Sequence, residues 1–469
     1  MSEYTPTIGL EIHVELCTNT KMFCDSKNDT DEERPNVNIC PVCMAYPGTL
    51  PVINKEAVRQ VLRVGTAVGG TIADYTEFDR KNYFYPDIPK GYQISQYKYP
   101  LVSGGEIAGV KLTRIHLEED TAKSTHDAGD YSLVDYNRAG VPLMELVTEP
   151  VIHDAETAGN FAREFQLLLT YIGASHANME KGEMRVEANI SVLRSDLENS
   201  DLKVRPLGTK VEVKNLNSFK AVEKAIRFEI DRHIALLEKG EKIVQETRGW
   251  DENKSVTFSQ RAKEDSHDYR YFPDPDLPKL FIKEIPEFSD ENLRASLPEL
   301  PWTKRERLVR EYGIKTEDAD MYVKFSDMGM YFEEVAKLIN RKEFNQLASN
   351  YFITDGKSTI NQNDFAELVT MAGKNEISSR AAKDMLKIMD KDGGSPRDIA
   401  EKQGLFQKSD TEELKKIAET IIEENQKVVG EYKAGNQALL QFFVGQGMKA
   451  SKGSANPGLL KGIFEELLK

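Results

Sequence analysis

The stretch PTIGLEIHVELC, from Pro6 to Cys17, alternates apolar and polar side chains along its length. Alternation with a period of two predicts a half-buried β-strand. One face of this strand is wholly apolar, and the other carries Glu11, His13 and Glu15. Antiparallel sheets often expose one face to water. The strand alone therefore leaves two interpretations open, an ordinary solvated surface, which is the commoner case, and an acidic metal site.

Three further segments repeat the pattern, each with an apolar face and a polar face that bears a glutamate. They are LTRIHLEED (112–120), RVEANISV (185–192) and KVEVKN (210–215). Their polar side chains are Arg114, His116, Glu118, Glu119, Asp120, Arg185, Glu187, Asn189, Ser191, Lys210, Glu212 and Lys214. Carboxylates that face one another across a sheet repel unless a cation lies among them. Oxygen ligands favour Mg²⁺, which typically works with a nucleotide phosphate, and arginine or lysine beside it would bind phosphoryl oxygens.

Composition limits the class of protein. The 469 residues are too many for one core, so two or three domains are expected. The 62 basic and 77 acidic residues give a net charge of −15, which argues against a general nucleic-acid binder, although a phosphate-binding surface needs only local positive charge. No segment has the apolar length of a membrane span, and the N-terminus lacks the pattern of a secretory signal. We therefore expect a cytoplasmic protein.

Helical and strand patterns divide the chain. Residues 1–295 mix alternating strands with two clear helices, expected at 154–173 and 218–240 between a capping residue and a glycine. Alternating strands favour an antiparallel α+β domain. Beyond the prolines at 298 and 301, nearly every segment has a helical period. We expect an α+β domain at 1–295, an all-helical domain at 296–407 and a small helical tail at 408–469.

The four cysteines are Cys17, Cys24, Cys40 and Cys43, all within the first 43 residues. A disulfide framework is unexpected in a cytosolic protein. The closing CPVC has the short spacing of a zinc knuckle, so we expect structural zinc on these cysteines. Only the second pair has that spacing, and reduced thiols without metal are the alternative.

The tail lacks acidic residues over 434–464, in a chain that is otherwise acidic. Its charge comes from lysines, and GQGMKASKGSANPG (445–458) is expected to form a Gly/Ser/Asn loop. Exposed backbone amides with lysines suit contacts with phosphate, while a flexible connection between helices is the alternative. The lysines concerned are Lys433, Lys449, Lys452 and Lys461.

Two segments are dense in aromatic and hydrogen-bonding side chains, FDRKNYFYPDIPKGYQISQY (78–97) and HDYRYFPDPDLP (267–278). Each suits a pocket lining or a base-stacking loop, although a loop that covers a core is the commoner case. The sequence contains no G-x-x-x-x-G-K-[ST], H-E-x-x-H or G-x-S-x-G motif. Nucleotide binding of the P-loop type is therefore not expected, and the chain gives no sign of releasing ammonia from glutamine itself.

Taken in order, these motifs resemble the B subunit of the tRNA-dependent amidotransferase that acts on Glu-tRNA(Gln) and Asp-tRNA(Asn), the GatB family. The resemblance covers essentially the whole chain, and FVGQGMKASKGSANPG is similar to the YqeY-like tail of that family. The motifs are IGLEIHVEL, CPVC, YPGTLPVIN, FDRKNYFYPDIPKGYQISQ, HLEEDTAKSTH, RVEANISV, KNLNSFKAVEKAI, QETRGWD and HDYRYFPDPDLP.

The resemblance implies a ligase that uses Mg-ATP to phosphorylate the side-chain carboxylate of the mischarged aminoacyl-tRNA, after which ammonia displaces the phosphate. An amidase, the A subunit, would supply the ammonia from glutamine or asparagine, and a small C subunit would complete a heterotrimer. The N-terminal cradle would resemble the catalytic domains of glutamine synthetase and guanido kinases, and the helical domain and tail would hold the tRNA. The alternative is a non-catalytic scaffold for tRNA in the same complex, and a free-standing ligase for a small acid is a third interpretation.

The resemblance also implies roles for individual residues. Glu11, His13, Glu118, Glu119 and Glu212 would bind Mg²⁺, Glu187 would join them in the catalytic cluster, and Arg185 and Lys210 would bind phosphoryl oxygens of ATP. His116 would be a structural neighbour. Many family members carry C-x-C where this chain has Cys24-Asp25-Ser26, so Cys17 would have to replace the missing zinc ligand.

Overall fold

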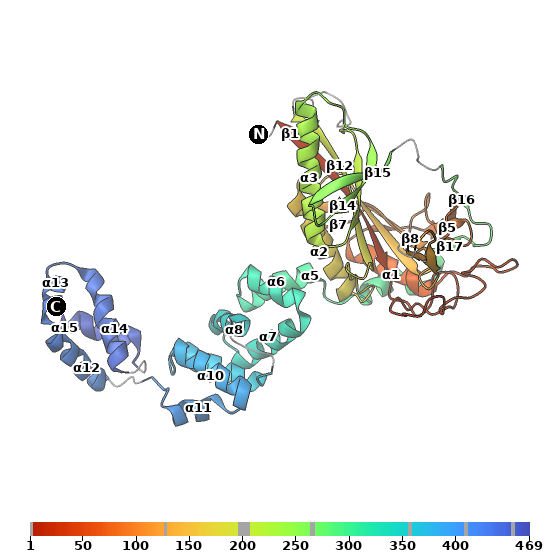
Figure 1. The fold of residues 1–469 in the computed structure, drawn as a ribbon. Coiled ribbons are helices and arrows are strands. Elements are labelled where there is room, and N and C mark those ends of the chain that lie inside the picture. The colour runs from red at the N-terminus through yellow and green to blue at the C-terminus, as the bar shows by residue number, and fades with distance from the viewer. Residues whose placement is uncertain are drawn as a thin grey trace. The chain divides into compact units, whose positions relative to one another are not determined.

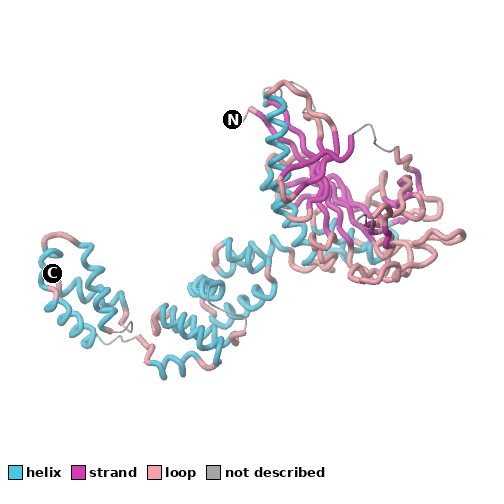
Figure 2. Tube along the Cα trace, viewed as in Figure 1, coloured by secondary structure: helices cyan, strands magenta, loops and turns pink. Residues whose placement is uncertain are grey.

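The computed structural model describes residues 3–125, 129–195, 207–262, 268–354, 359–407, 411–451 and 455–469. The chain forms two compact units, residues 1–301 and 302–469 (Figure 1). The first unit contains the sheet, and the second is helical (Figure 2). Each unit is described by itself.

A ten-stranded sheet forms the frame of the first unit. Its strands are β1 (Tyr4–Glu15), β2 (Thr71–Ile72), β6 (Val102–Ser103), β7 (Glu106–Ile107), β8 (Val110–Glu119), β11 (Pro142–Thr148), β12 (Met184–Arg194), β13 (Val211–Leu216), β14 (Glu246–Asp251) and β15 (Val256–Ala262). The order is β15-β14-β13-β12-β1-β11-β8-β6-β2, and β7 pairs with β8. The four strands predicted to carry glutamates are β1, β8, β12 and β13, and the structure confirms all of them as strands.

The sheet is mixed, so the prediction of a wholly antiparallel sheet was wrong at one pair. Strands β13 and β14 are parallel, with Glu212 opposite Thr247. The helix α3 (Phe219–Glu238) connects them. Parallel neighbours need such a crossover, because a short turn can join only antiparallel strands. The other paired strands within the described residues are antiparallel.

Helices cover the apolar face of the sheet. The α-helices that the structure describes in this unit are α1 (Lys55–Ala67), α2 (Ala155–Tyr171), α3 and α4 (Asp290–Ala295). Helix α3 packs on β12, β13 and β15 and against α2, along one side of the strands (Figure 1). The side chains of Ile12 and Val14 are fully buried. Each buried aliphatic side chain contributes about 2 kcal/mol, so this layer holds β1 with its apolar face inward.

The two helices expected in this part of the sequence are confirmed as α2 and α3. The Asp154 side chain accepts a hydrogen bond from the Thr157 backbone amide, and the Ser218 side chain accepts one from the Ala221 amide. These caps satisfy amides that have no partner inside the helix.

Smaller sheets flank the large one. They pair β16 (Phe272–Pro273) with β4 (Asp79–Asn82) and β5 (Tyr92–Ser95), β17 (Leu280–Phe281) with β3 (Tyr75–Thr76), and β9 (Lys123–Thr125) with β10 (Leu133–Asp135). The two aromatic segments of the sequence therefore meet in space, because β16 comes from one and β4 and β5 from the other. Strand β5 also contacts β8, which brings both segments beside the large sheet.

The second unit consists of helices joined by short connections. They are α5 (Pro301–Arg307, which begins at the boundary), α6 (Thr316–Lys324), α7 (Ser326–Ile339), α8 (Lys342–Thr354), α9 (Gln362–Gly373), α10 (Ser379–Asp392), α11 (Pro396–Gln403), α12 (Thr411–Glu424), α13 (Gln426–Lys433), α14 (Leu440–Ala450) and α15 (Pro457–Leu467). No described helix has both the length and the apolar character needed to span a bilayer.

The tail helices share a hydrophobic core of their own, which includes Phe443, Leu460 and Phe464. The prediction of a loop over 445–458 was wrong at both ends, since residues 445–450 belong to α14 and residues 457–458 begin α15. Gly447 is buried there, and a Cβ at this position would meet Leu460 at 3.0 Å. The glycine is explained by close packing of two helices. The division of the second unit near residue 408 stays a prediction.

A buried ionic network ties α3 to the strands β14 and β15. The fully buried Glu229 accepts hydrogen bonds from Arg232 and Thr257, and its carboxylate lies 3.2 Å from both His233 Nε2 and Arg248 Nε. Burial alone would raise the pKa of Glu229, but the hydrogen bonds from His233, Arg232 and Thr257 lower it to about 2.

This network predicts a stability that depends on pH. Because the pKa of Glu229 is lower in the folded state than its ordinary value, its contribution is present above that ordinary value and is lost as the pH falls toward 2. We expect Glu229→Gln to lower the free energy of unfolding by about 3 kcal/mol at pH 7 and by roughly half as much at pH 3. Urea titrations at several pH values measure this. Glu241→Gln, on the exposed turn after α3, is the control. A difference in unfolding free energy between Glu229→Gln and wild type that does not change with pH would contradict the prediction.

Candidate functional site

The polar face of the large sheet brings an imidazole and several carboxylates together. His13 on β1 lies opposite Glu145 on β11, and Glu145 lies opposite His116 on β8. His13 Nε2 is 3.4 Å from Glu145 Oε2, 3.7 Å from Glu11 Oε1 and 3.8 Å from Glu118 Oε1. Three neighbouring strands thus contribute to one centre.

A second group of carboxylates adjoins the first through Glu11. Glu11 lies opposite Glu187 on β12, and ligand atoms of Glu11, Glu187 and Glu212 all lie within 4.8 Å of one another. Lys214 on β13 places its Nζ 2.8 Å from Glu187 Oε2 and 3.7 Å from Glu212 Oε1. We call the set Glu11, His13, Glu118, Glu145, Glu187 and Glu212 the acidic centre.

Crowding of like charges perturbs the titration of the acidic centre. Burial, together with the charges of Glu145 and Glu187, raises the pKa of Glu11 to about 7. Burial would lower the pKa of His13, but its hydrogen bond with Glu145 and the neighbouring carboxylates raise it to about 9. The surplus of carboxylates over cationic groups is the arrangement that a bound cation would relieve.

The donor atoms of the acidic centre fit a hard divalent cation. Carboxylate oxygens predominate, and oxygen ligands are those that Mg²⁺ prefers. Asn189, on the same face as Glu187, has a buried Oδ1 that accepts no hydrogen bond from any described residue. An unpaired oxygen beside carboxylates is a suitable ligand for such an ion or for its water. We find the residues present compatible with Mg²⁺.

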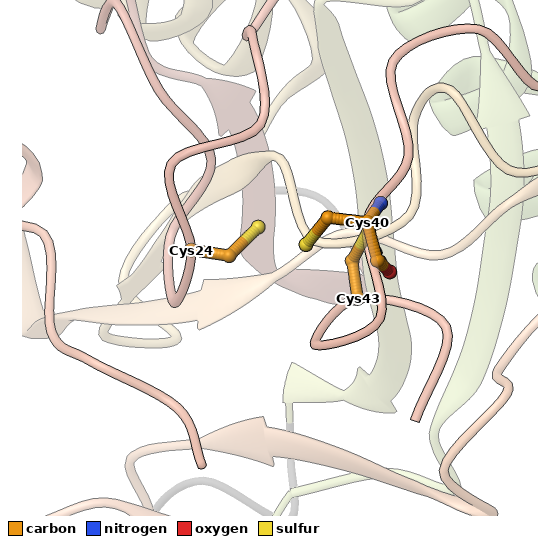
Figure 3. Close-up of side chains that lie close together, drawn as sticks. All are labelled: Cys24, Cys40 and Cys43. Atoms are coloured by element: carbon orange, nitrogen blue, oxygen red, sulfur yellow. Dashed lines mark hydrogen bonds between the residues drawn. The ribbon is translucent and has the colours of Figure 1, made fainter. Parts of the chain in front are cut away.

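Three of the four cysteines form a separate group near the N-terminus. Cys24 lies on one loop, and Cys40 and Cys43 lie on another (Figure 3). Their sulfur atoms are all within 4.8 Å of one another. A hydrogen bond with Cys24 lowers the pKa of Cys43 to about 5, with the ammonium of the buried Lys21 acting in the same sense and burial opposing both. Three convergent thiols are a donor set that suits zinc.

Comparison with known proteins identifies the family. A model of the GatB/GatE catalytic domain matches residues 6–286, and a model of the GatB domain matches residues 329–468. The chain belongs to the GatB family. It is 44% identical to the B subunit of the aspartyl/glutamyl-tRNA(Asn/Gln) amidotransferase of Persephonella marina, over 100% of both chains. It is also 43% identical to the B subunit of the Caldanaerobacter subterraneus enzyme and 41% identical to that of Thermotoga maritima, over 99% of each chain in both cases.

The structure brings most of the site residues expected from the GatB resemblance together. Glu11, His13, Glu118, Glu187 and Glu212 meet in the acidic centre. The buried His116 lies beside them, with its Nε2 3.5 Å from Glu145 Oε2. The roles of these residues in binding metal and in catalysis stay predictions.

Glu119 does not reach the acidic centre. Its carboxylate accepts hydrogen bonds from the Ile94 amide and from Lys90. Successive residues of a strand face opposite ways, so Glu118 and Glu119 cannot both point at His13. Glu119 instead lines a cavity of about 310 Å³ together with Cys24, Cys43 and Lys90.

The two expected phosphate ligands differ in position. Arg185 lies opposite His13 on β12, and its Nη2 donates to Asp120 Oδ2 at 2.8 Å. Lys210 is exposed and precedes β13. Lys214, four residues later, is the lysine that contacts the glutamates of the centre.

Cys17 lies apart from the thiol group. It is exposed, and its backbone amide donates to Ala174 O beyond the end of β1. Three of the four described thiols therefore converge, and Cys17, the expected fourth zinc ligand, is not one of them. Ser26 lies beside the thiol group, with its Oγ 3.9 Å from Cys43 Sγ.

Sequence reasoning missed Glu145 and Lys81. Glu145 is the only charged residue in the run VPLMELV (141–147), and such a lone charge in a buried strand is the signal that could have identified it. Lys81 lies on β4, where its ammonium interacts with the charges of Glu118 and Glu145, but its aromatic segment has no sequence periodicity that indicates which way the side chain points.

The three-thiol geometry predicts which cysteines retain zinc. We expect the purified chain to carry about one zinc ion, Cys43→Ser to lose it, and Cys17→Ser to keep it, because Cys17 lies outside the group. Elemental analysis of the three proteins measures this, with circular dichroism to check folding. Loss of zinc in Cys17→Ser, or wild-type protein without zinc, would contradict the assignment.

Proposed function

We propose that this chain is the part of the tRNA-dependent amidotransferase that activates the side-chain carboxylate of a mischarged aminoacyl-tRNA with ATP. The substrates are Glu-tRNA(Gln), Asp-tRNA(Asn) or both, and the reaction is that of a ligase which forms a carbon–nitrogen bond. The full-length similarity to B subunits supports the overall activity. The convergence of carboxylates around His13 supports the location of the chemistry.

The reaction needs an activated carboxylate because oxide is not a feasible leaving group. A side-chain oxygen attacks the γ-phosphorus of ATP, the bond to the β-phosphate oxygen breaks, and ADP leaves. Ammonia then attacks the acyl phosphate, loses a proton, and inorganic phosphate departs to leave the amide. The first step depends on positioning and on electrostatic stabilisation of the phosphoryl group.

The acidic centre supplies both requirements. Glu11, Glu187 and Glu212 would hold Mg²⁺ with the carboxylates around His13, and the ion would neutralise charge between the phosphates. Lys214 sets the positions of Glu187 and Glu212 through its contacts with both. Arg185 would contact phosphoryl oxygens from the edge of the centre, where its guanidinium is already oriented by Asp120.

Substitution in the acidic centre tests this function. We expect His13→Ala and Glu145→Gln to reduce Glu-tRNA-dependent ATP cleavage by at least about 100-fold, because each removes a group that orients the phosphoryl transfer. Phosphate release by the assembled amidotransferase at saturating tRNA measures this. Lys220→Gln, which alters an exposed lysine on α3 outside the centre, serves as the matched control.

The same measurement separates catalysis from the scaffold alternative. A scaffold variant would lose affinity for tRNA and keep its turnover at saturating tRNA. Cleavage near the wild-type rate in both centre variants would refute the proposed site. Glu119→Gln, measured in parallel, tests the role in metal binding that the family resemblance assigns to that residue.

The names of the curated relatives denote the B subunit of an amidotransferase, so the chain is one part of a multi-subunit enzyme that acts on tRNA. The expected partners are the A subunit, an amidase that would supply ammonia, and the small C subunit. The chain itself would contribute ATP cleavage and amide formation.

The tail is proposed to bind the body of the tRNA. Lys433, Lys449 and Lys461 are exposed on its helices, and Lys452 lies outside the described residues. We expect deletion of residues 408–469 to weaken tRNA binding by about tenfold, since several lysine–phosphate contacts would be lost. Fluorescence anisotropy with labelled tRNA at moderate salt measures the affinity, and the thermal unfolding of the remaining chain is the folding control. Unchanged affinity would refute this role.

A further inference from the structure

Four tyrosines from the two aromatic segments form a continuous row of rings, which we call the tyrosine array. Tyr97 stacks on Tyr271 with ring centroids 4.3 Å apart and an interplanar angle of 10°. Tyr271 meets Tyr269 edge-on at 6.1 Å, and Tyr269 meets Tyr83 edge-on at 6.2 Å. Residues almost 190 positions apart in the sequence thus build one aromatic surface.

Backbone contacts hold the array in place. The Asn82 side-chain NH₂ group donates hydrogen bonds to the carbonyl oxygens of Tyr269 and Arg270. The Asn82 backbone N–H also donates a hydrogen bond to the Tyr269 carbonyl oxygen. Strands β16 and β4 pair directly beside these contacts, with Arg80 opposite Phe272. A row of rings fixed from both sides loses little conformational freedom when it binds a further ring.

The aromatic segments adjoin the acidic centre, because β5 contacts β8 and the Ser95 hydroxyl donates a hydrogen bond to Glu118 Oε2 at 3.1 Å. The Nζ atom of Lys81 lies 5.0 Å from the ring centroid of Tyr269. Burial raises the pKa of Tyr271 to about 12, with Glu118 and Glu145 acting in the same direction and Lys81 opposing them. The same two glutamates raise the pKa of the Lys81 ammonium, against the effect of burial.

The outer end of the array is open to solvent. Tyr97 is 63% exposed, and Phe84, in the same segment, is 93% exposed. Small-molecule sites usually enclose most of the ligand, as an adenine pocket for ATP would. Exposed rings beside cationic side chains are instead typical of surfaces on which unpaired bases of a nucleic-acid strand stack.

We propose that the tyrosine array stacks the unpaired 3′-terminal bases of the mischarged tRNA. The inference rests on the proposed function, because the amino acid is esterified to the terminal ribose of the tRNA. A centre that acts on the amino-acid side chain must therefore have the terminal nucleotide beside it. The array begins beside the acidic centre and leads outward to solvent. The unpaired 3′ end of the tRNA would have to follow the same path.

Substitution of the exposed Tyr97 tests the proposal without disturbing the core. We expect Tyr97→Leu in the assembled amidotransferase to raise KM for Glu-tRNA by about tenfold, with kcat and the KM for ATP within about twofold of wild type. Tyr97→Phe should retain the wild-type KM, because it keeps the ring. Tyr131→Leu, which alters an exposed tyrosine between β9 and β10, is the control.

A double-mutant cycle identifies the stacked group. The affinities of wild type and Tyr97→Leu are compared for uncharged tRNA with and without all of its unpaired 3′-terminal nucleotides, because Tyr97 lies at the outer end of the array. The proposal predicts that the two losses are strongly non-additive, because each removes one half of the same contact. Additive losses, an unchanged KM for Glu-tRNA, or an increase confined to the KM for ATP would each overturn it.

The proposed function can fail separately from the array. If His13→Ala retains ATP cleavage, the assignment of the acidic centre fails whatever Tyr97→Leu does. If His13→Ala abolishes cleavage and Tyr97→Leu leaves the KM for Glu-tRNA unchanged, only the role of the array is refuted.

Discussion

Burial of the apolar face of β1 beneath the helical layer is the constraint on which the site depends. Ile12 and Val14 are fully buried, and each contributes about 2 kcal/mol to holding the strand in this orientation. Because side chains alternate along a strand, Glu11 and His13 must then point to the opposite face. A slip of one residue in register would place both polar groups in the core, so the hydrophobic core itself fixes the position of the acidic centre.

The same constraint assembles the centre from strands distant in sequence. Each contributing strand buries its apolar face in the same layer, so their polar faces converge without any loop to position them. The resulting excess of carboxylates costs free energy, as the raised pKa of Glu11 indicates. Lys214 and His13 offset part of this repulsion, and a bound cation would offset more. The net charge of −15 is thus a poor guide to function, because the local arrangement of charges determines what the centre binds.

Periodicity in the sequence predicted the four strands that bear glutamates, the two capped helices and five members of the acidic centre. It could not predict strand order, since no local pattern states that β11 lies between β1 and β8. Glu145 was missed because the run VPLMELV has no alternating polar face, although Glu145 is the closest described carboxylate to His13. Family resemblance grouped Glu118 with Glu119, whereas the alternation of a strand separates their side chains. The tyrosine array was out of reach because it depends on contacts between two irregular segments far apart in the chain.

The most direct test of the central claim follows a side-chain oxygen through the reaction. Glu-tRNA labelled with ¹⁸O in the side-chain carboxylate is incubated with ATP, an amide donor and the assembled enzyme, and the inorganic phosphate is examined by mass spectrometry. Phosphorylation of the carboxylate predicts one ¹⁸O atom in the phosphate for each amide formed, and loss of this transfer in Glu187→Gln. Phosphate without the label, or unchanged transfer in Glu187→Gln, would contradict the account.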